Sequence, residues 1–218
     1  MKKKTVTIIP ARGGSKGIPK KNLTSLCGNP LIYYSVKASI DCKKIDETWV
    51  SSDDDDIIRY CRSLGAKTIK RPDYLCTDTA SSESAIEHFC NEVDFKTMVF
   101  VQATSPLITS KILTSAIESH FSDDSVDSTV AGFLDHGFWW DEKGPCFDPL
   151  NRPTRQKQGL LYKESGMFYI TSREGFLQSG CRYSGSAKIF EVDRMSSLEV
   201  DSIEDLKLIE LIMRNKNV

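Results

Sequence analysis

A glycine-rich stretch near the start of the chain concentrates positive charge. Residues 11–22 read ARGGSKGIPKKN, with four basic residues, three glycines and no acidic residue. Glycines permit positive φ and let backbone N–H groups converge on an anion. Arginine offers a planar fork of donors and lysine a point charge, the two side chains with which proteins commonly hold phosphate. The stretch therefore predicts a polyphosphate site around Gly13, Gly14 and Gly17, with Arg12 and Lys16 as its first cations.

The spacing of the glycines excludes the two commonest phosphate-binding loops. The dinucleotide fingerprint GxGxxG is absent. The pattern GxxxxGK[ST] is absent too, because Lys16 precedes Gly17 instead of following a second glycine. The remaining alternative is a basic surface turn whose glycines serve only the backbone geometry.

Two carboxylates stand just before the last predicted helix, at Glu199 and Asp201. Taken alone, these residues favour Asp201 as a helix N-cap, which Glu204 three residues later would support. Carboxylates can also hold Mg²⁺ together with substrate phosphates. Residues two apart on an extended segment point to opposite sides, and both can bind one ion only if the chain turns.

The sequence predicts a scaffold in which strands alternate with helices. Short β-branched runs bounded by Pro or Gly indicate strands, and apolar residues at helical spacing indicate helices. This alternation implies βαβ units, hence an α/β fold with a mostly parallel sheet and helices on both faces. The glycine-rich stretch follows the first strand, at the end where open α/β sheets bind ligands. Strands are expected at 4–10, 47–52, 66–71, 97–102, 128–134, 166–171 and 188–193, and helices at 30–40, 54–65, 81–93, 110–121, 172–180 and 202–216.

The alternation stops between residues 135 and 162. This segment contains two Trp and three Pro and shows no clear period. We expect a single domain over residues 1–218, with 135–162 as an irregular arm whose aromatic residues suit a subunit interface. The alternative is a long loop whose tryptophans pack on their own core. In the last helix, we expect Ile203, Leu206, Ile209 and Met213 on one apolar face.

The composition excludes several classes of protein. A formal net charge of −1 gives no reason to expect nucleic acid as a partner. No apolar run approaches the roughly 18 residues that span a membrane. The seven cysteines form no CxxC pair and the three histidines do not cluster, which argues against a disulfide framework or a zinc site. We therefore expect a cytoplasmic protein with reduced thiols, without nucleic acid or membrane partners.

The first motif, IIPARGGSKGIPKKNL, closely resembles the signature of the acylneuraminate cytidylyltransferases, the CMP-sialic acid synthetases and their relatives. SSDDDDI, RPDYLCTDTASS, QATSPL and EVDSIEDLKL follow in the order of that family, so the resemblance covers most of the chain. It implies a Rossmann-like nucleotide-diphospho-sugar transferase fold with a small dimerisation arm. It also implies transfer of CMP from CTP to the anomeric hydroxyl of a nine-carbon 2-keto-3-deoxy sugar acid, with release of pyrophosphate.

The same resemblance implies roles for individual residues. Those it implies as catalytic are Arg12, Lys16, Lys21 and Asp201. Those it implies as nucleotide-binding are Ala11, Arg12, Gly13, Gly14, Ser15, Lys21, Asn22, Arg71, Ser81 and Ser82, with the last three at cytosine-reading positions. Gln102 and Arg155 are implied for the sugar, and Asp201 and Glu199 for Mg²⁺ or a substituting Mn²⁺. Glu199 stands where the family usually has Asp. Ser81 and Ser82 could equally cap the following helix, and Arg155 could instead form an interface salt bridge.

The partners implied by the resemblance are CTP, a nine-carbon sugar acid and a second copy of the chain in a homodimer. Two other functions remain open. One is a non-catalytic nucleotide-sugar binding protein, although Arg12, Lys21 and Asp201 are all present. The other is a nucleotidyltransferase of the same fold that acts on the eight-carbon acid Kdo, although GGSKGIPKKN is closer to the nine-carbon branch.

Overall fold

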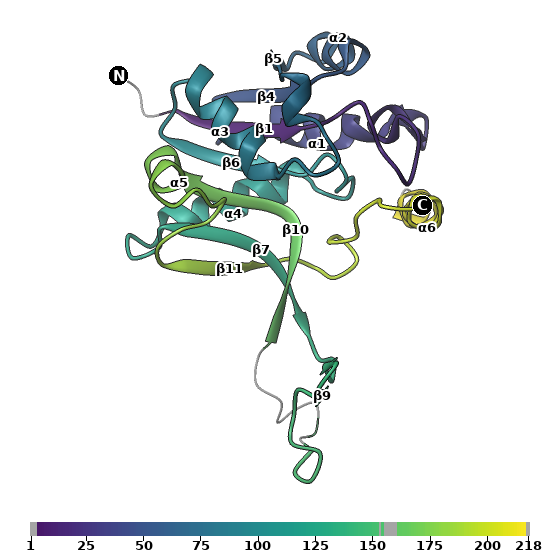
Figure 1. Ribbon diagram of the computed structural model, residues 1–218, viewed down its shortest axis with the longest axis vertical. Helices are drawn as coiled ribbons and strands as arrows, with labels where there is room; N and C mark the ends of the chain where they lie inside the picture. Colours follow the sequence, from purple (N-terminus) through teal and green to yellow (C-terminus); the bar gives the residue numbers. More distant parts are fainter. Residues whose placement is uncertain (1–3, 153, 155–160, 217–218) are drawn as a thin grey trace.

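The computed structural model describes residues 4–152, 154 and 161–216, and Figure 1 shows their arrangement. Arg155, predicted to contact the sugar, lies outside the described residues. The central sheet consists of β1 (Thr5–Pro10), β4 (Glu47–Ser52), β5 (Lys67–Lys70), β6 (Thr97–Val101), β7 (Ser128–Asp135), β10 (Leu161–Ser172) and β11 (Ala187–Glu191). These seven strands lie in the order β11-β7-β10-β6-β1-β4-β5.

The sheet is mostly parallel, as predicted. β1 pairs in parallel with β4 and β6, β4 with β5, and β7 with β11, whereas β10 runs antiparallel to both of its neighbours. After β1, the chain first extends the sheet on one side through β4 and β5, and then returns to the other side with β6. This reversal creates a switch point at the carboxyl ends of β1 and β6, where open α/β sheets bind ligands.

The helices that pack on the sheet are α1 (Leu31–Ile40), α2 (Asp55–Ser63), α3 (Ser82–Glu92), α4 (Ser110–Phe121) and α5 (Arg173–Ser179). Helices α1, α2 and α4 share one core, in which Val36 and Leu113 are buried together with Ile9 of β1. Helices α3 and α5 share another, in which Phe89 is buried together with Ile8. Because neighbouring residues of a strand point to opposite faces, Ile8 and Ile9 hold helices on the two sides of the sheet. The predicted fold is confirmed.

Polar residues fix the ends of these helices. Asp54 accepts hydrogen bonds from two backbone N–H groups in the first turn of α2, and Gly65 just beyond that helix has a φ of +95°. Ser81 accepts a hydrogen bond from the backbone N–H of Ser84 at the start of α3. The predicted capping role of Ser81 is therefore confirmed. This cap fixes the N-terminus of α3, which lies at the edge of the sheet formed by the carboxyl ends of the parallel strands.

β7 and β10 extend beyond the body of the protein and form the base of the arm (Figure 1). β10 begins at Leu161, earlier than predicted, and pairs with β7 as far as Asp135. The arm also carries a small hairpin of β8 (Trp140–Asp141) and β9 (Gly144–Pro145). The expectation that 135–162 is wholly irregular is wrong at both ends, because antiparallel pairing continues past the packed core.

A second small hairpin, β2 (Ser25–Leu26) and β3 (Asn29–Pro30), was not predicted. Its turn residues Cys27 and Gly28 have φ values of 47° and 88°. Two successive positive φ values are typical of the tight turns that join antiparallel strands.

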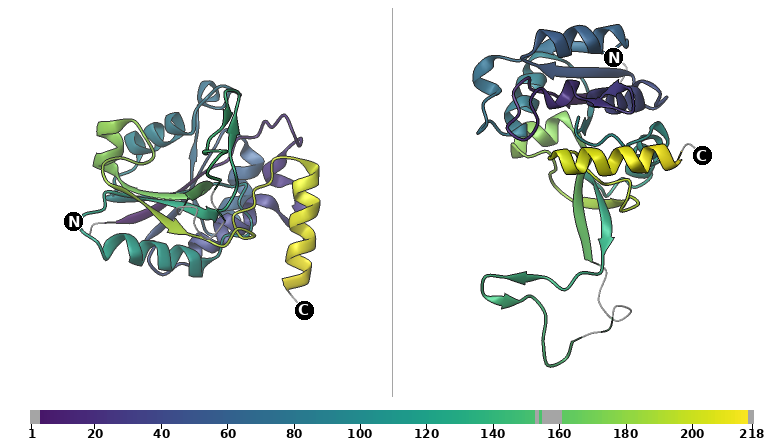
Figure 2. Two further views of the ribbon diagram at one scale, coloured as in Figure 1. Left: turned by 90° about the horizontal axis from the view of Figure 1, so that it is seen from below. Right: turned by 90° about the vertical axis from the view of Figure 1, so that its right-hand side faces the viewer.

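Helix α6 (Ile203–Lys216) lies outside the helices that cover the sheet, as Figure 2 shows. Its buried Ile209 packs in a third core with Leu26 of the hairpin, and Leu206 and Met213 are partly buried there. Ile203, predicted on the same face, is 39% exposed, because the first turn of α6 lies at the surface. That part of the prediction is wrong. None of the described helices has the length and apolar character needed to cross a membrane.

Candidate active site

The glycine-rich loop, residues 11–20, connects β1 to a short 3-10 helix, η1 (Lys21–Leu23), at the switch point. Hydrogen bonds fix its start. The backbone N–H of Ala11 donates to Ser51 O of β4 at 2.9 Å, and the buried side chain of Asn22 donates to Arg12 O at 3.0 Å. Ala11 and Asn22 therefore fix the loop that places Arg12 at the edge of the sheet where the parallel strands have their carboxyl ends.

Two of the three loop glycines, Gly13 and Gly17, serve close packing. Among the described residues, the positive φ of this loop is at Lys20, with a value of 50°, and not at any of its three glycines. A Cβ on Gly13 would lie 2.8 Å from Asp54, and one on Gly17 would lie 2.6 Å from the backbone oxygen of Asp201. The expectation that these glycines supply positive φ is wrong. Gly13 and Gly17 are required because the loop lies directly against two other segments at these positions.

Asp53 ties the tip of the loop to the end of β4. Its Oδ1 accepts a hydrogen bond from the backbone N–H of Gly13 at 2.8 Å. The next two loop residues, Gly14 and Ser15, follow this anchor, and Gly14 is exposed with no atom within 4 Å of where a Cβ would stand. The backbone at Gly14 is thus open to solvent next to the anchored Gly13.

Two of the predicted cations meet at one carboxylate. Arg12 Nη1 lies 2.9 Å from Asp78 Oδ1, and Lys16 Nζ lies 3.1 Å from Asp78 Oδ2. Arg12 Nη1 also donates to the backbone oxygen of Thr77 at 2.9 Å. Lys16, followed by Arg12, holds the pKa of the Asp78 carboxyl below its ordinary value. The structure therefore brings Arg12 and Lys16 within reach of one anionic group.

The third predicted cation, Lys21, meets the segment before α6. Its Nζ donates to Val200 O at 2.9 Å and lies 3.1 Å from Asp201 Oδ1. The helix is capped by other residues, because Ser202 and Asp205 exchange hydrogen bonds between side chain and backbone. The alternative reading of Asp201 as the N-cap is thus wrong, and its side chain is 76% exposed.

Glu199 points to the other side of this segment and is largely buried. Its Oε1 accepts a hydrogen bond from Ser105 Oγ at 3.1 Å, and a Cβ on Gly166 would lie 2.6 Å from the same oxygen. Burial raises the pKa of Glu199 to about 7, and the nearby Asp201 adds to this rise while the hydrogen bond from Ser105 opposes it. The two carboxylates therefore occupy different environments, as alternation along an extended segment predicts.

The chemistry of these donors suits a divalent cation bound mainly through Asp201. No group of three or more His, Cys, Asp or Glu side chains that could hold a metal occurs among the described residues. Mg²⁺ needs no such cage, because it keeps waters and commonly binds one or two carboxylates plus substrate phosphates. Asp201 offers an exposed carboxylate beside Lys21, whereas Glu199 is turned toward Ser105.

The predicted base-reading residues lie next along the same edge. Arg71 follows β5 and is only 5% exposed, and its Nε is a buried donor without a hydrogen-bond partner among the described residues. Ser81 and Ser82 begin α3, whereas Gln102 directly follows β6 and is half-buried. A buried, unpaired guanidinium nitrogen is costly unless a ligand or water satisfies it, so Arg71 is suited to a polar ligand.

Sequence reasoning gave no role to Asp53, Asp78 or Ser105. The motifs SSDDDDI, RPDYLCTDTASS and QATSPL contain them, so the signal was present. Their contacts join segments far apart in the chain, and periodicity cannot reveal such contacts.

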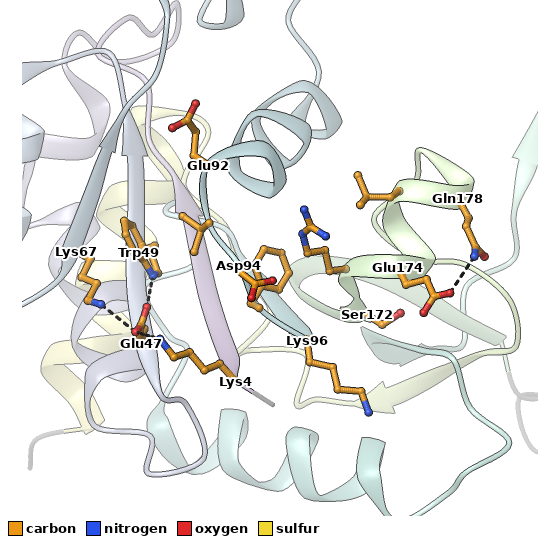
Figure 3. A pocket seen from close by; sticks show the side chains of 14 residues that line it. Lys4, Glu47, Trp49, Lys67, Glu92, Asp94, Lys96, Ser172, Glu174 and Gln178 are labelled. Atoms are coloured by element: carbon orange, nitrogen blue, oxygen red, sulfur yellow. Dashed lines mark hydrogen bonds and ion pairs between the residues drawn. The ribbon is translucent and has the colours of Figure 1, made fainter. Parts of the chain in front are cut away.

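A cavity of about 1140 Å³ lies at the opposite, amino-terminal edge of the sheet (Figure 3). Its lining is mixed in charge and includes Trp49, Lys96 and Glu174. There Glu47 lies 2.7 Å from Lys4 Nζ and 2.9 Å from Lys67 Nζ. The cavity is remote from the glycine-rich loop and takes no part in the site described above.

The comparison with family models decides the family. A model described as Cytidylyltransferase matches residues 6–217. The chain belongs to this cytidylyltransferase family. The match includes both the glycine-rich loop and the acidic segment at Glu199 and Asp201, and it confirms the resemblance seen in the motifs.

Relatives of this cytidylyltransferase chain include enzymes from animals and bacteria. It is 34% identical to N-acylneuraminate cytidylyltransferase A of Danio rerio over 89% of this chain and 47% of that protein. It is 29% identical to pseudaminic acid cytidylyltransferase of Campylobacter jejuni over 97% of both chains. The chain thus spans about half the length of its vertebrate relative and nearly all of the Campylobacter relative.

Solved structures share the fold. CMP:2-keto-3-deoxy-manno-octonic acid synthetase complexed with CTP matches 98% of this chain and 99% of its own, with a TM-score of 0.75 and 18% identity. A 4-diphosphocytidyl-2C-methyl-D-erythritol synthase from Anaerococcus prevotii matches 97% of this chain and 96% of its own, with a TM-score of 0.73 and 13% identity. At these identities the likeness concerns the fold alone.

Proposed function

We propose that the chain transfers CMP from CTP to the anomeric hydroxyl of a nine-carbon 2-keto-3-deoxy sugar acid and releases pyrophosphate. The observation that carries the proposal is the contact of Lys21, which directly follows the cationic glycine-rich loop, with the carboxylate of Asp201 at the switch point. Family membership and the activities in the names of the relatives support it.

In this reaction, the anomeric oxygen attacks the α-phosphorus of CTP, and the bond from that phosphorus to the bridging oxygen of the β-phosphate breaks. The hydroxyl proton passes to solvent or to a neighbouring base. Arg12, Lys16 and Lys21 hold the phosphates and stabilise the charge that develops on pyrophosphate. The backbone at Gly14 and Ser15 adds N–H donors at the loop tip.

The nucleotide base would lie between Arg71 and the start of α3. Cytosine presents acceptors at O2 and N3, which a guanidinium and the hydroxyls of Ser81 and Ser82 can recognise. Gln102, at the end of β6, would contact the sugar acid. Asp201 would bind Mg²⁺ or Mn²⁺, and the ion supplies charge neutralisation on the phosphates.

The proposal also covers the identity of the sugar acid, the use of the CMP-sugar, the cellular location and the oligomeric state. The acid belongs to the group that includes sialic, legionaminic and pseudaminic acids, and the CMP-sugar would serve cell-surface polysaccharide synthesis. We propose a cytoplasmic homodimer formed through the arm, because Trp139 and Trp140 are 46% and 66% exposed there.

The test is pyrophosphate release from CTP and Mg²⁺ across a panel of these acids, with Kdo included. Asp201→Asn is expected to lower turnover on the order of 100-fold, as loss of a charged group at a reacting phosphate does. Its thermal unfolding should change little, because Asp201 does not cap α6. The matched control Asp41→Asn removes an exposed aspartate that pairs with Lys37 in the preceding turn of α1, and it should keep full activity. Full activity of Asp201→Asn would contradict the metal assignment.

A further inference from the structure

The two ion pairs of Asp78 have a consequence for nucleotide binding. Asp78 lies on the segment between β5 and α3, and its two carboxylate oxygens contact Arg12 and Lys16 separately. A carboxylate and a phosphate compete for the same donors, because both are anionic oxygen acceptors. A triphosphate cannot take the full hydrogen-bonding capacity of Arg12 and Lys16 while Asp78 retains it.

We propose that Asp78 is an internal competitor for the phosphate-binding cations, which CTP must displace and which helps to expel pyrophosphate. This inference rests on the proposed function. In binding, the phosphates break the contacts of Asp78 with Arg12 and Lys16. After transfer, the return of the carboxylate to these donors opposes rebinding of pyrophosphate.

The neighbourhood of Asp78 permits this exchange. The side chain is 43% exposed, and so it can turn into solvent without a burial penalty. Arg12 keeps a second contact, to Thr77 O, which does not depend on the carboxylate. The same segment leads within three residues to Ser81, the N-cap of α3. Displacement of Asp78 therefore acts on the segment that leads to the proposed cytosine-reading end of α3.

The inference predicts that Asp78→Asn binds phosphates more tightly. Removal of two partly exposed ion pairs should lower the Kd for CTP and for inorganic pyrophosphate about three- to tenfold, measured by calorimetry without sugar. The Kd for CMP should change less, because CMP lacks the β- and γ-phosphates. In turnover assays, pyrophosphate should become a correspondingly stronger product inhibitor.

The matched control is Asp55→Asn, which removes one exposed negative charge from the same edge but breaks a pair with Lys70 instead. It should leave both Kd values within about twofold of the wild type. An unchanged Kd for pyrophosphate in Asp78→Asn would overturn the inference. Weaker binding of pyrophosphate would overturn it too, because Asp78 would then be a residue that positions the cations. If pyrophosphate binds more tightly to the variant but no acid of the panel supports turnover, Asp78 still competes with phosphates for the cations, whereas the proposed function fails.

Discussion

At the scale of single residues, the site depends on how closely four segments approach one another. Gly17 lies against the backbone of Asp201, Gly13 against Asp54, and Gly166 against Glu199. Each contact leaves no room for a Cβ. Close packing of this kind transmits the position of one segment to the next, and so the glycines set where the cations and carboxylates meet.

Gly17 provides a direct test of this packing. In Gly17→Ala, the added Cβ would stand 2.6 Å from Asp201 O, so either the loop or the acidic segment must shift. We expect a loss of about 1–3 kcal/mol in the free energy of unfolding, the usual cost of overpacking, measured by urea denaturation.

Gly14→Ala is the matched control for stability, since a Cβ there meets no atom within 4 Å and the residue lacks a positive φ. It should leave the free energy of unfolding unchanged or raise it slightly, because alanine restricts the unfolded chain. Equal stabilities for the two variants would show that the loop does not rest on Asp201.

At the scale of elements, the start of α6 separates a structural role from a chemical one. Ser202 and Asp205 satisfy the first turn of the helix, and so Asp201 is left to face Lys21. Ser202→Ala should therefore cost about 1 kcal/mol of the free energy of unfolding. Asp201→Asn should cost much less while it lowers turnover. Urea denaturation of both variants measures the two losses. A larger loss in Asp201→Asn than in Ser202→Ala would show that Asp201, and not Ser202, caps α6.

Glu47 links the start of β4 to two lysines, and its titration should appear in the pH dependence of stability. The hydrogen bond with Lys4, followed by those with Lys67 and Trp49 and against the effect of burial, lowers the pKa of Glu47 to about 2. A carboxyl whose folded pKa is depressed stabilises the protein above its unfolded pKa. This contribution is lost as the pH falls from about 5 toward 2.

Glu47→Gln should accordingly be less stable than the wild type by about 2 kcal/mol at pH 7, and this difference should shrink as the pH falls toward 3. Glu118→Gln is a matched control, because Glu118 is 55% exposed and, among the described residues, pairs with Lys44 alone. A constant difference between pH 7 and pH 3 would argue against the ion pairs as its cause.

At the scale of the whole molecule, the alternating elements could be predicted because buried runs such as TVTIIP and TMVFV carry a clear signal. The hairpin of β2 and β3 is too short to show a period. The outer third of β10, LYKE, has no buried residue, so its pairing with β7 left no apolar pattern. The cations, Glu199 and Asp201 were found through motifs. Asp78, which pairs with Arg12 and Lys16, and Ser105, which donates to Glu199, could not be assigned, because these contacts exist only once distant loops gather at one edge.

The arm is the segment through which two copies of the chain would associate in the proposed dimer. It leaves the body through β7 and β10 and exposes Trp140, whose ring contacts Phe147 only at its edge, with centroids 6.1 Å apart. Exposed aromatic residues on a projection are typical of a buried interface core in an oligomer. Trp140→Ser should therefore shift the chain from dimer to monomer, measured by sedimentation velocity across protein concentrations. Phe121→Ser, at an exposed aromatic at the end of α4, should sediment like the wild type. If wild type and Trp140→Ser are both monomers, the proposed dimer is excluded; if both are dimers of equal affinity, Trp140 is not part of the interface.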